Sequence, residues 1–190
     1  LELGHLLDEM RLFKDREELK LMQRAADISV EAHRAAMRAA RPGVHEYQLQ
    51  AALEQVFRHH DAEPAYASIV GAGANACVLH YRANAAQAQD GDLVLIDAGA
   101  EYRGYAADIT RTFPINGRFG KEQRALHDLV AAAQRAALAQ AQPGVPYEAG
   151  HVAAVETLTE GLLSLGLLKG SLKQNLAAGH YKRFYLHKTG

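Results

Sequence analysis

An internal repeat is the feature of this sequence that most restricts its fold. Residues 32–44 align with residues 133–145, and eight of the thirteen positions are identical. Each copy ends an alanine-rich helical pattern at Pro-Gly and is followed by a second amphipathic segment. We therefore expect two related halves, each built on a pair of helices. The alternative is two unrelated helices that share a common stop signal.

The spacing of the repeat also predicts what the second half contains. The two copies are offset by 101 residues, so the counterpart of a strand pair at residues 93–113 would begin beyond Gly190. We expect an incomplete second half, in which the apolar faces of Leu129, Val130, Val155 and Leu158 lack a covering sheet.

Periodicity and turn residues predict the order of the elements. Asp15, with Glu18 three residues later, forms a capping pattern at the start of the first helix. The expected helices cover residues 15–41, 45–60, 121–142 and 146–165, and the expected strands cover residues 66–71, 77–81, 93–98, 105–113 and 183–187. Residues 93–96 are apolar without alternation, so we expect both faces of that strand to be covered. These elements predict an α+β fold.

Composition and charge exclude several classes of protein. Hydrophobic residues make up 48% of the chain and charged residues 23%, as in ordinary globular proteins. A net charge of -1 provides no field that would attract nucleic acid or anionic lipid. No apolar run approaches the roughly 18 residues of a spanning helix, and residues 1–11 do not resemble a signal peptide. The single cysteine, Cys77, favours a reducing compartment, so we expect a cytoplasmic location.

Two aspartates carry the main chemical signal. Asp97 follows four apolar residues, and Asp108 lies on the next expected strand. An antiparallel hairpin that turns through residues 101–104 would place the two side chains opposite each other on one face, with Cβ atoms about 5 Å apart. Like charges at that distance require a shared proton or bound divalent cations, and hard cations prefer oxygen ligands.

Other interpretations of this pair stay open at this point. Asp97 could end its strand at a turn while Asp108 points into water, as aspartates beside glycine often do. A metal-free pair could also share one proton, or act as acid and base on a glycoside.

Two histidines are further candidates. His80 ends the expected strand at residues 77–81, where an imidazole could bind substrate or support an anionic intermediate. His187 follows Phe184-Tyr185-Leu186 and receives the same interpretation. For both, a partly buried histidine that hydrogen-bonds a backbone carbonyl is the structural alternative. The other histidines, among them the His59-His60 pair, are interpreted as surface or helix-cap residues.

The segment at residues 93–114, LVLIDAGAEYRGYAADITRTFP, closely resembles the first metal-ligand signature of aminopeptidase P, an Xaa-Pro aminopeptidase. Two aspartates eleven positions apart, the second of which opens Asp-Ile-Thr-Arg-Thr-Phe, make this motif highly specific. The resemblance extends from residues 10–14 through residues 69–71 and 79–81 to residues 184–187. It implies the pita-bread fold shared with prolidase and methionine aminopeptidase, in which two pseudo-symmetric halves surround a curved antiparallel sheet.

The resemblance also implies roles for individual residues. Asp97 and Asp108 match two of five ligands of a dinuclear site, usually manganese, with a bridging hydroxide as the nucleophile. His80 matches a catalytic and substrate-binding histidine near the scissile bond. His187 matches the first histidine of a His-x-x-x-His stretch that lines the substrate pocket, whose second histidine would follow Gly190. The remaining ligands of the family lie beyond this sequence, so these 190 residues alone are expected to be inactive.

The resulting hypothesis is a cytoplasmic, metal-dependent exopeptidase that releases the N-terminal residue from peptides with proline in second position. Proline lacks the N–H that general peptidases bind, which makes a dedicated pocket plausible. Residues 1–14 are expected to link to a further N-terminal domain, and residues 15–190 to form the catalytic domain, with halves at 15–119 and 120–190. A homo-oligomer is part of the hypothesis. The rivals are a prolidase, which cuts only dipeptides, and a non-catalytic binding module of the same fold.

Overall fold

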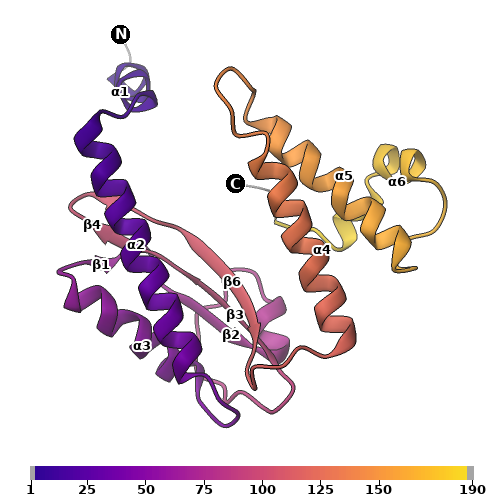
Figure 1. Cartoon of the computed structure of the whole chain (residues 1–190), viewed down its shortest axis with the longest axis horizontal. Coiled ribbons are helices and arrows are strands. Elements are labelled where there is room, and N and C mark those ends of the chain that lie inside the picture. Colours follow the sequence, from indigo (N-terminus) through magenta and orange to yellow (C-terminus); the bar gives the residue numbers. More distant parts are fainter. Residues whose placement is uncertain (1–2, 188–190) are drawn as a thin grey trace. The chain divides into compact units, whose positions relative to one another are not determined.

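The chain divides between Arg118 and Phe119 into two units, and the computed structural model describes residues 3–187. The first unit contains α1 (Leu3–Leu12), α2 (Arg16–Ala39), α3 (Glu46–His59), β1 (Glu63–Pro64), β2 (Ile69–Ala72), the 3-10 helix η1 (Gly73–Cys77), β3 (Leu93–Ala98), β4 (Ala100–Tyr102), β5 (Tyr105–Ala106) and β6 (Ile109–Pro114). The second unit contains α4 (Lys121–Leu138), α5 (Glu148–Ser164), α6 (Leu172–Ala178) and the 3-10 helix η2 (His180–Arg183). Figure 1 labels the helices and strands.

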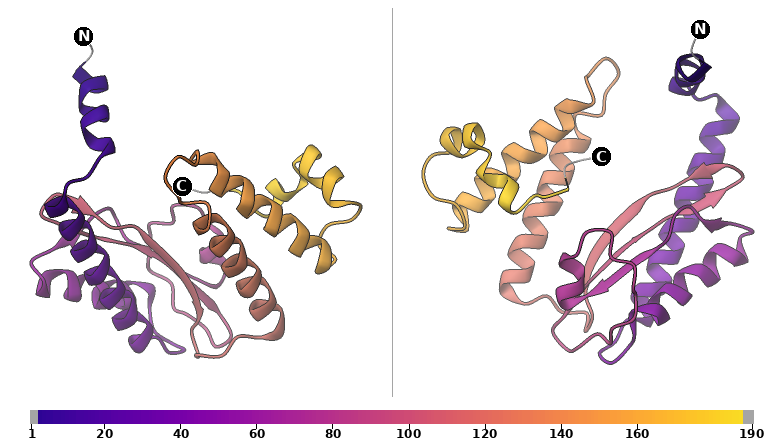
Figure 2. Two further views of the ribbon diagram at one scale, coloured as in Figure 1. Left: turned by 45° about the horizontal axis from the view of Figure 1, so that its top comes forward. Right: turned by 180° about the vertical axis from the view of Figure 1, so that it is seen from behind.

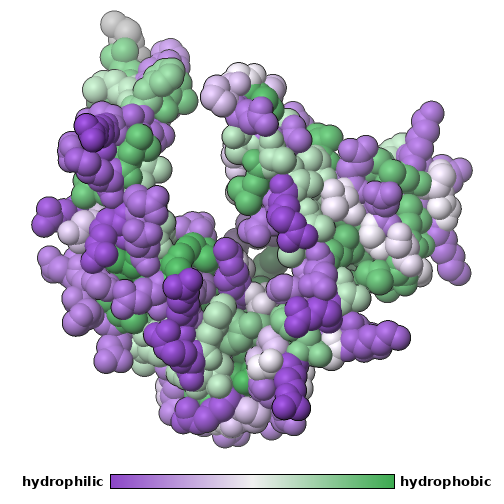
Figure 3. Space-filling view, viewed as in Figure 1, coloured by the Kyte–Doolittle hydropathy of each residue, from purple (hydrophilic) through white to green (hydrophobic). Residues whose placement is uncertain are grey.

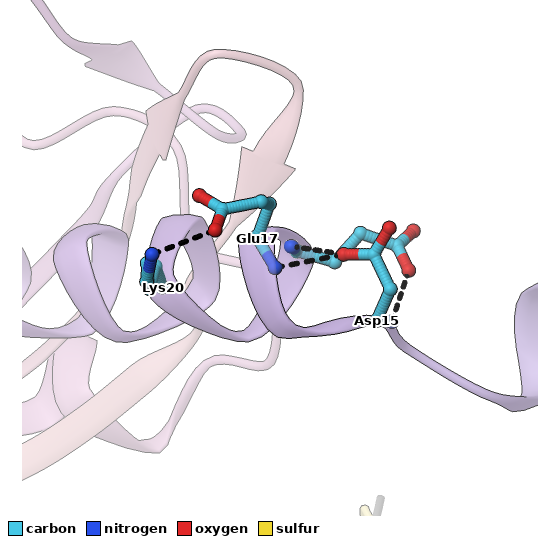
Figure 4. A network of polar contacts seen from close by, with 4 residues as sticks. Asp15, Glu17 and Lys20 are labelled. Atoms are coloured by element: carbon cyan, nitrogen blue, oxygen red, sulfur yellow. Dashed lines mark hydrogen bonds and ion pairs between the residues drawn. The ribbon is translucent and has the colours of Figure 1, made fainter.

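The start of α2 confirms the capping pattern in the sequence. The Asp15 carboxylate accepts hydrogen bonds from the backbone N–H groups of Glu17 and Glu18, both at 2.8 Å. The Glu18 side chain in turn accepts from the Asp15 N–H at 2.6 Å. Figure 4 shows Asp15 and Glu17 at this start of α2. The reciprocal bonds satisfy backbone donors that a helix start leaves unpaired, so α2 begins where the sequence predicts.

The core of the first unit lies between the α2–α3 pair and an antiparallel sheet. This sheet has the order β2-β3-β6, and a second small sheet has the order β1-β4-β5. Figures 1 and 2 show α2 and α3 side by side on one face of these strands. The largest fully buried apolar side chains are those of Phe57, Ile28, Leu49, Leu53, Ile96, Ile115, Val70 and Val94. Burial of these side chains is the main stabilising contribution to the unit.

Strand β3 has the predicted bounds but differs from prediction in its burial. Val94 and Ile96 are fully buried beneath the helices, whereas Leu93 and Leu95 on the opposite face are only half-buried. The prediction that both faces are covered is therefore wrong. The helices α2 and α3 bury one face of the sheet, and this leaves the face that includes Asp97 partly accessible.

Two expected strands are not strands in the structure. Residues 77–81 include the end of η1 and a turn, because His80 has a φ of 53° that no strand residue adopts. Residues 183–187 begin with the last residue of η2 and form no strand, and the N–H groups of Phe184 and Tyr185 bond back to the Tyr181 carbonyl. Local turn bonds replace a strand ladder in both segments.

Two helices were not expected from the sequence. The helix α1 lies where a linker was expected. The helix α6 ends at Ala178 and is followed by Gly179, whose φ of 67° suits a helix C-cap. No residue of α1 is buried. Figure 3 shows apolar side chains at the surface of α1. Leu3 and Met10 of this helix are 69% and 75% exposed.

The second unit confirms the repeat, since α4 and α5 form a helix pair as α2 and α3 do. The offset of the repeat maps Ala32, Ala36, Leu49, Leu53 and Phe57 of the first core onto Ala133, Ala137, Gly150, Ala154 and Leu158. These five counterparts line an apolar groove of about 670 Å³. Val130 is 59% exposed, as expected of an uncovered face, but Val155 is buried, and for that residue the prediction is wrong.

No helix in the described part of the chain combines the length and apolar character that crossing a bilayer requires.

Candidate metal centre

A tyrosine hydroxyl joins the two aspartates. Tyr66 lies in the coil between β1 and β2, Asp97 on β3, and Asp108 between β5 and β6. The Tyr66 hydroxyl oxygen is 2.6 Å from Asp97 Oδ1 and 2.8 Å from Asp108 Oδ1. The two carboxylates therefore converge on one oxygen atom, and their side chains lie on the same side of the sheet, as predicted.

The register between the two segments differs from the predicted one. Asp97 pairs with Thr110 rather than with Asp108, which lies two positions earlier on the facing segment. The hairpin turns through only two residues, Arg103 and Gly104, with φ values of 51° and 88°. A two-residue turn with positive φ at both positions matches the twist of the strands, and it makes the aspartates diagonal neighbours.

The charge of this cluster suits a cation. Tyr66 has one hydroxyl hydrogen, so it can satisfy only one of the two carboxylates at a time. Burial and then the hydrogen bonds to Asp97 and Asp108 raise the pKa of Tyr66 far above its usual value, which keeps the hydroxyl protonated. Two carboxylates on one side of a sheet provide hard oxygen donors for a divalent cation.

The residues present fit part of a metal site. Asp97 is half-buried and Asp108 is exposed, so both carboxylates combine a fixed position with access for a cation. Within residues 3–187, no group of three or more histidine, cysteine, aspartate or glutamate side chains is placed to hold a metal ion. Among the described residues, Asp97 and Asp108 are therefore the two carboxylates that could hold such an ion.

Gly99 allows the aspartate hairpin to close. A Cβ atom at this position would lie 1.7 Å from the carbonyl oxygen of Ala107, the residue before Asp108. Because real side chains never approach so closely, only glycine permits this contact between the two segments.

Polar side chains of α2 hold the other side of the hairpin. The Ser29 hydroxyl accepts from the Ala100 N–H at 2.8 Å, and His33 Nε2 donates to the Ala98 carbonyl at 3.0 Å. These bonds satisfy backbone groups on both sides of Gly99, where the main sheet gives way to the smaller one. His33 is only 3% exposed, so its interpretation as a surface or cap residue is wrong.

The sequence contained weak signals for these supporting residues. Ser29 and His33 are polar, four positions apart, and lie on the apolar face of a helix, a pattern that buried polar groups with fixed partners produce. Nothing local marks Tyr66, because its partners are 31 and 42 residues away.

We expect Tyr66→Phe to weaken metal binding by roughly 10- to 100-fold, the usual cost of losing a group that orients a metal ligand. The change removes only the hydroxyl that fixes Asp97 and Asp108. Calorimetric titration of the metal-free protein with Mn²⁺ measures the effect. Tyr105→Phe is the matched control, since it removes a hydroxyl bonded to Glu18 at the start of α2. Equal affinities of the two variants would contradict this role.

We also expect His33 to make folding stability depend on pH. Burial lowers the pKa of His33, an effect larger than the opposing hydrogen bond to Ala98. In the unfolded chain histidine has a pKa of about 6.5, so between that value and the lower folded value the unfolded state binds more protons. Stability should fall as the pH falls through this window.

Urea unfolding from about pH 7.5 to about pH 5 measures the effect. His33→Gln cannot ionise and should flatten the profile, whereas the exposed His59→Gln should retain it. A full pH slope in the His33 variant would refute the assignment.

The two candidate histidines lie on other segments than the aspartates. His80 lies in the first unit, exposed on the loop that follows η1, with a φ of 53°. His187 lies in the second unit, exposed beyond η2. The aspartate pair is therefore the part of the predicted site that the described geometry assembles.

Three comparisons of this chain with known proteins give consistent matches. The model of metallopeptidase family M24 matches residues 20–190. The Xaa-Pro aminopeptidases of Escherichia coli K12 and Haemophilus influenzae are each 43% identical, over 96% and 97% of this chain. The aminopeptidase PepP structure from Pseudomonas aeruginosa matches 98% of the chain with 51% identity and a TM-score of 0.96. The chain spans 42% to 43% of the length of these three relatives.

Proposed function

The chain belongs to metallopeptidase family M24 and has its pita-bread fold, and on that premise we propose that the protein carrying it is an Xaa-Pro aminopeptidase. It would release the N-terminal residue from peptides with proline in second position. The observation that carries the proposal is the convergence of Asp97 and Asp108 on Tyr66, in a chain whose solved relatives are aminopeptidases P.

Each residue of the site has a role in this proposal. Asp97 and Asp108 would hold the metal ions, and Tyr66 would keep their carboxylates in one orientation. When bound, divalent ions supply Lewis acidity toward the peptide carbonyl and make water a better nucleophile at neutral pH. His80 would support the negative charge that develops on the substrate, and His187 would line the substrate pocket.

We propose that the site binds two metal ions and that these ions are manganese. Oxygen ligands from carboxylates are typical of manganese sites. A solved relative from Escherichia coli is a zinc-substituted aminopeptidase P in complex with product, so that enzyme also accepts zinc. Metal analysis of the protein purified without added metal identifies the resident ion.

Activity assays on the full-length gene product test the function. We expect hydrolysis of a Xaa-Pro-Xaa peptide at the bond before proline, loss of activity after chelation, and recovery with Mn²⁺. Turnover of Xaa-Pro dipeptides alone would assign a prolidase instead. Activity that survives chelation would support a metal-free carboxylate pair, and binding without turnover would indicate a non-catalytic module.

The remaining elements of the proposal concern organisation and location. Residues 1–14 would connect to a further domain, and residues 15–190 would belong to the catalytic domain. The single, exposed Cys77 supports a reducing, cytoplasmic location. A homo-oligomer is proposed as well, and light scattering of the full-length gene product tests it.

A further inference from the structure

Glu46 is a buried carboxylate outside the aspartate pair. It is the first residue of α3, and only 1% of its surface is exposed. Its Oε1 atom accepts from the Ala72 N–H at 2.8 Å and from Asn75 Nδ2 at 2.9 Å. Its Oε2 atom accepts from the Tyr81 hydroxyl and the Ala86 N–H, both at 2.9 Å. Four donors therefore converge on one side chain from a single stretch of chain, residues 72–86.

That stretch carries His80, and the residues around this histidine have little apolar packing. Residues 78–83 form no helix or strand, and Val78 and Leu79 are 53% and 54% exposed. Apolar burial therefore contributes little to the position of this loop. Bonds to Glu46 hold the loop on both sides of His80, at Asn75 before it and at Tyr81 and Ala86 after it.

A second buried side chain, that of Asn84, anchors the loop on the C-terminal side of His80. Asn84 is 5% exposed, accepts from the Val70 N–H at 3.0 Å, and donates to the Ser68 carbonyl at 2.8 Å and to Gln50 Oε1 at 2.9 Å. These bonds attach the loop to β2, the segment before it and α3. The loop thus has polar anchors in place of an apolar core.

The backbone of His80 needs such anchors. Its φ of 53° lies in the left-handed region, which is unfavourable for a residue other than glycine. A residue keeps that conformation only when its surroundings impose it, and such residues gather at functional sites. The neighbouring Tyr81 connects this strained position directly to Glu46.

The pocket around Glu46 is built for an ionised carboxylate. Burial would raise the pKa of Glu46, but the hydrogen bonds from Asn75, Ala72, Ala86 and Tyr81 outweigh it and lower the pKa. The N-terminus of α3 also favours a negative charge. Each carboxylate oxygen receives one backbone N–H, so a glutamine amide would oppose a backbone donor in either orientation.

We propose that Glu46 is a positioning residue for His80. It holds both ends of the loop that carries this histidine. The inference rests on the proposed function, in which His80 acts at the substrate. Glu46 itself touches neither substrate nor metal in this scheme. Its substitution should therefore act through the placement of His80 and leave the metal ligands intact.

A double-mutant cycle in the full-length gene product, assayed with Mn²⁺ and a Xaa-Pro-Xaa peptide, tests this role. Glu46→Gln should lower kcat/KM by about 10- to 100-fold, mainly through kcat, with unchanged metal content. In a His80→Ala background the same change should alter kcat/KM by less than about twofold, because the group that it positions is gone. Equal losses in both backgrounds, or loss of metal, would overturn the proposal.

Hydrogen exchange supplies a readout that needs no activity. Glu46→Gln should speed amide exchange in residues 77–86 and leave α2 and α4 unchanged. If that variant does not fold, Tyr81→Phe removes one of the four bonds and should show the same pattern more weakly. Unchanged exchange in the loop would overturn the inference, whereas a wild-type protein without Xaa-Pro activity would count only against the proposed function.

Asn175→Ala is the matched control. Asn175 is 1% exposed and donates to the carbonyls of Lys169 and Ser171, so its loss removes a buried polar group in the second unit. Its effect on kcat/KM should be the same with and without His80, and exchange in residues 77–86 should not change. A His80-dependent effect of Asn175→Ala would mean that any buried polar loss produces the signature, which would overturn the proposal.

Discussion

Asp108→Ala in the full-length gene product should abolish tight metal binding and lower peptidase activity by more than about 100-fold, since loss of a direct ligand exceeds the cost of losing an orienting group. Asp108 and Asp97 offer the two carboxylates that converge on Tyr66. With one carboxylate gone, a cation at this position loses one of the two negative charges that Asp97 and Asp108 supply. Metal content after dialysis and turnover of a Xaa-Pro-Xaa peptide measure the two effects.

The stability of the same variant separates a metal ligand from a structural residue. Two carboxylates beside one hydroxyl repel each other, so the metal-free Asp108→Ala protein should melt at the same temperature as the metal-free wild type, or higher. Added Mn²⁺ should raise the Tm of the wild type and not that of the variant, because only the wild type binds the ion. Destabilisation without metal would instead assign Asp108 a structural role.

Asp90→Ala is the control for this experiment. Asp90 is exposed in the same unit and accepts one hydrogen bond from Asn116 at 2.8 Å. Metal content, activity and the Mn²⁺-induced rise in Tm should all match the wild type. Loss of metal in both variants would show that general charge, rather than the placement of Asp108, governs binding.

Gly99→Ala should destabilise the protein more than the addition of a methyl group at any other glycine of the first unit. The new Cβ would lie 1.7 Å from the Ala107 carbonyl oxygen and 2.5 Å from its carbonyl carbon, and both are backbone atoms. The hairpin must therefore open at the residue next to Asp108. We expect a loss of about 3 kcal/mol in unfolding free energy, at the upper end for overpacking, together with metal affinity reduced at least as far as in Tyr66→Phe.

Gly4→Ala is the matched control, because a Cβ at Gly4 meets no atom within 4 Å. Alanine also favours the helical conformation of α1, so this variant should be as stable as the wild type or slightly more stable. Urea unfolding and Mn²⁺ titration compare the two proteins. If Gly99→Ala keeps both wild-type stability and metal affinity, the close approach of the two segments does not position Asp108.

Local sequence patterns predicted much of the first unit because neighbouring residues determine them. The cap at Asp15, the breaks at Pro-Gly and the strand at residues 93–98 depend on backbone and side-chain preferences within a few positions. The repeat predicted the second helix pair for the same reason. At residues 77–81 and 183–187 the prediction failed because these segments contain strand-like residues whose backbone bonds are made in turns.

The sequence by itself determined the helix pairs, the central strand and the presence of two aspartates on one side of a hairpin, because these follow from periodicity and alternation along the chain. Only the tertiary structure decided the register of that hairpin, the tyrosine that joins Asp97 to Asp108, and the burial of His33 and Glu46. The tyrosine contact and the burial of His33 and Glu46 depend on contacts between residues 26 to 65 positions apart, and no local preference specifies such contacts.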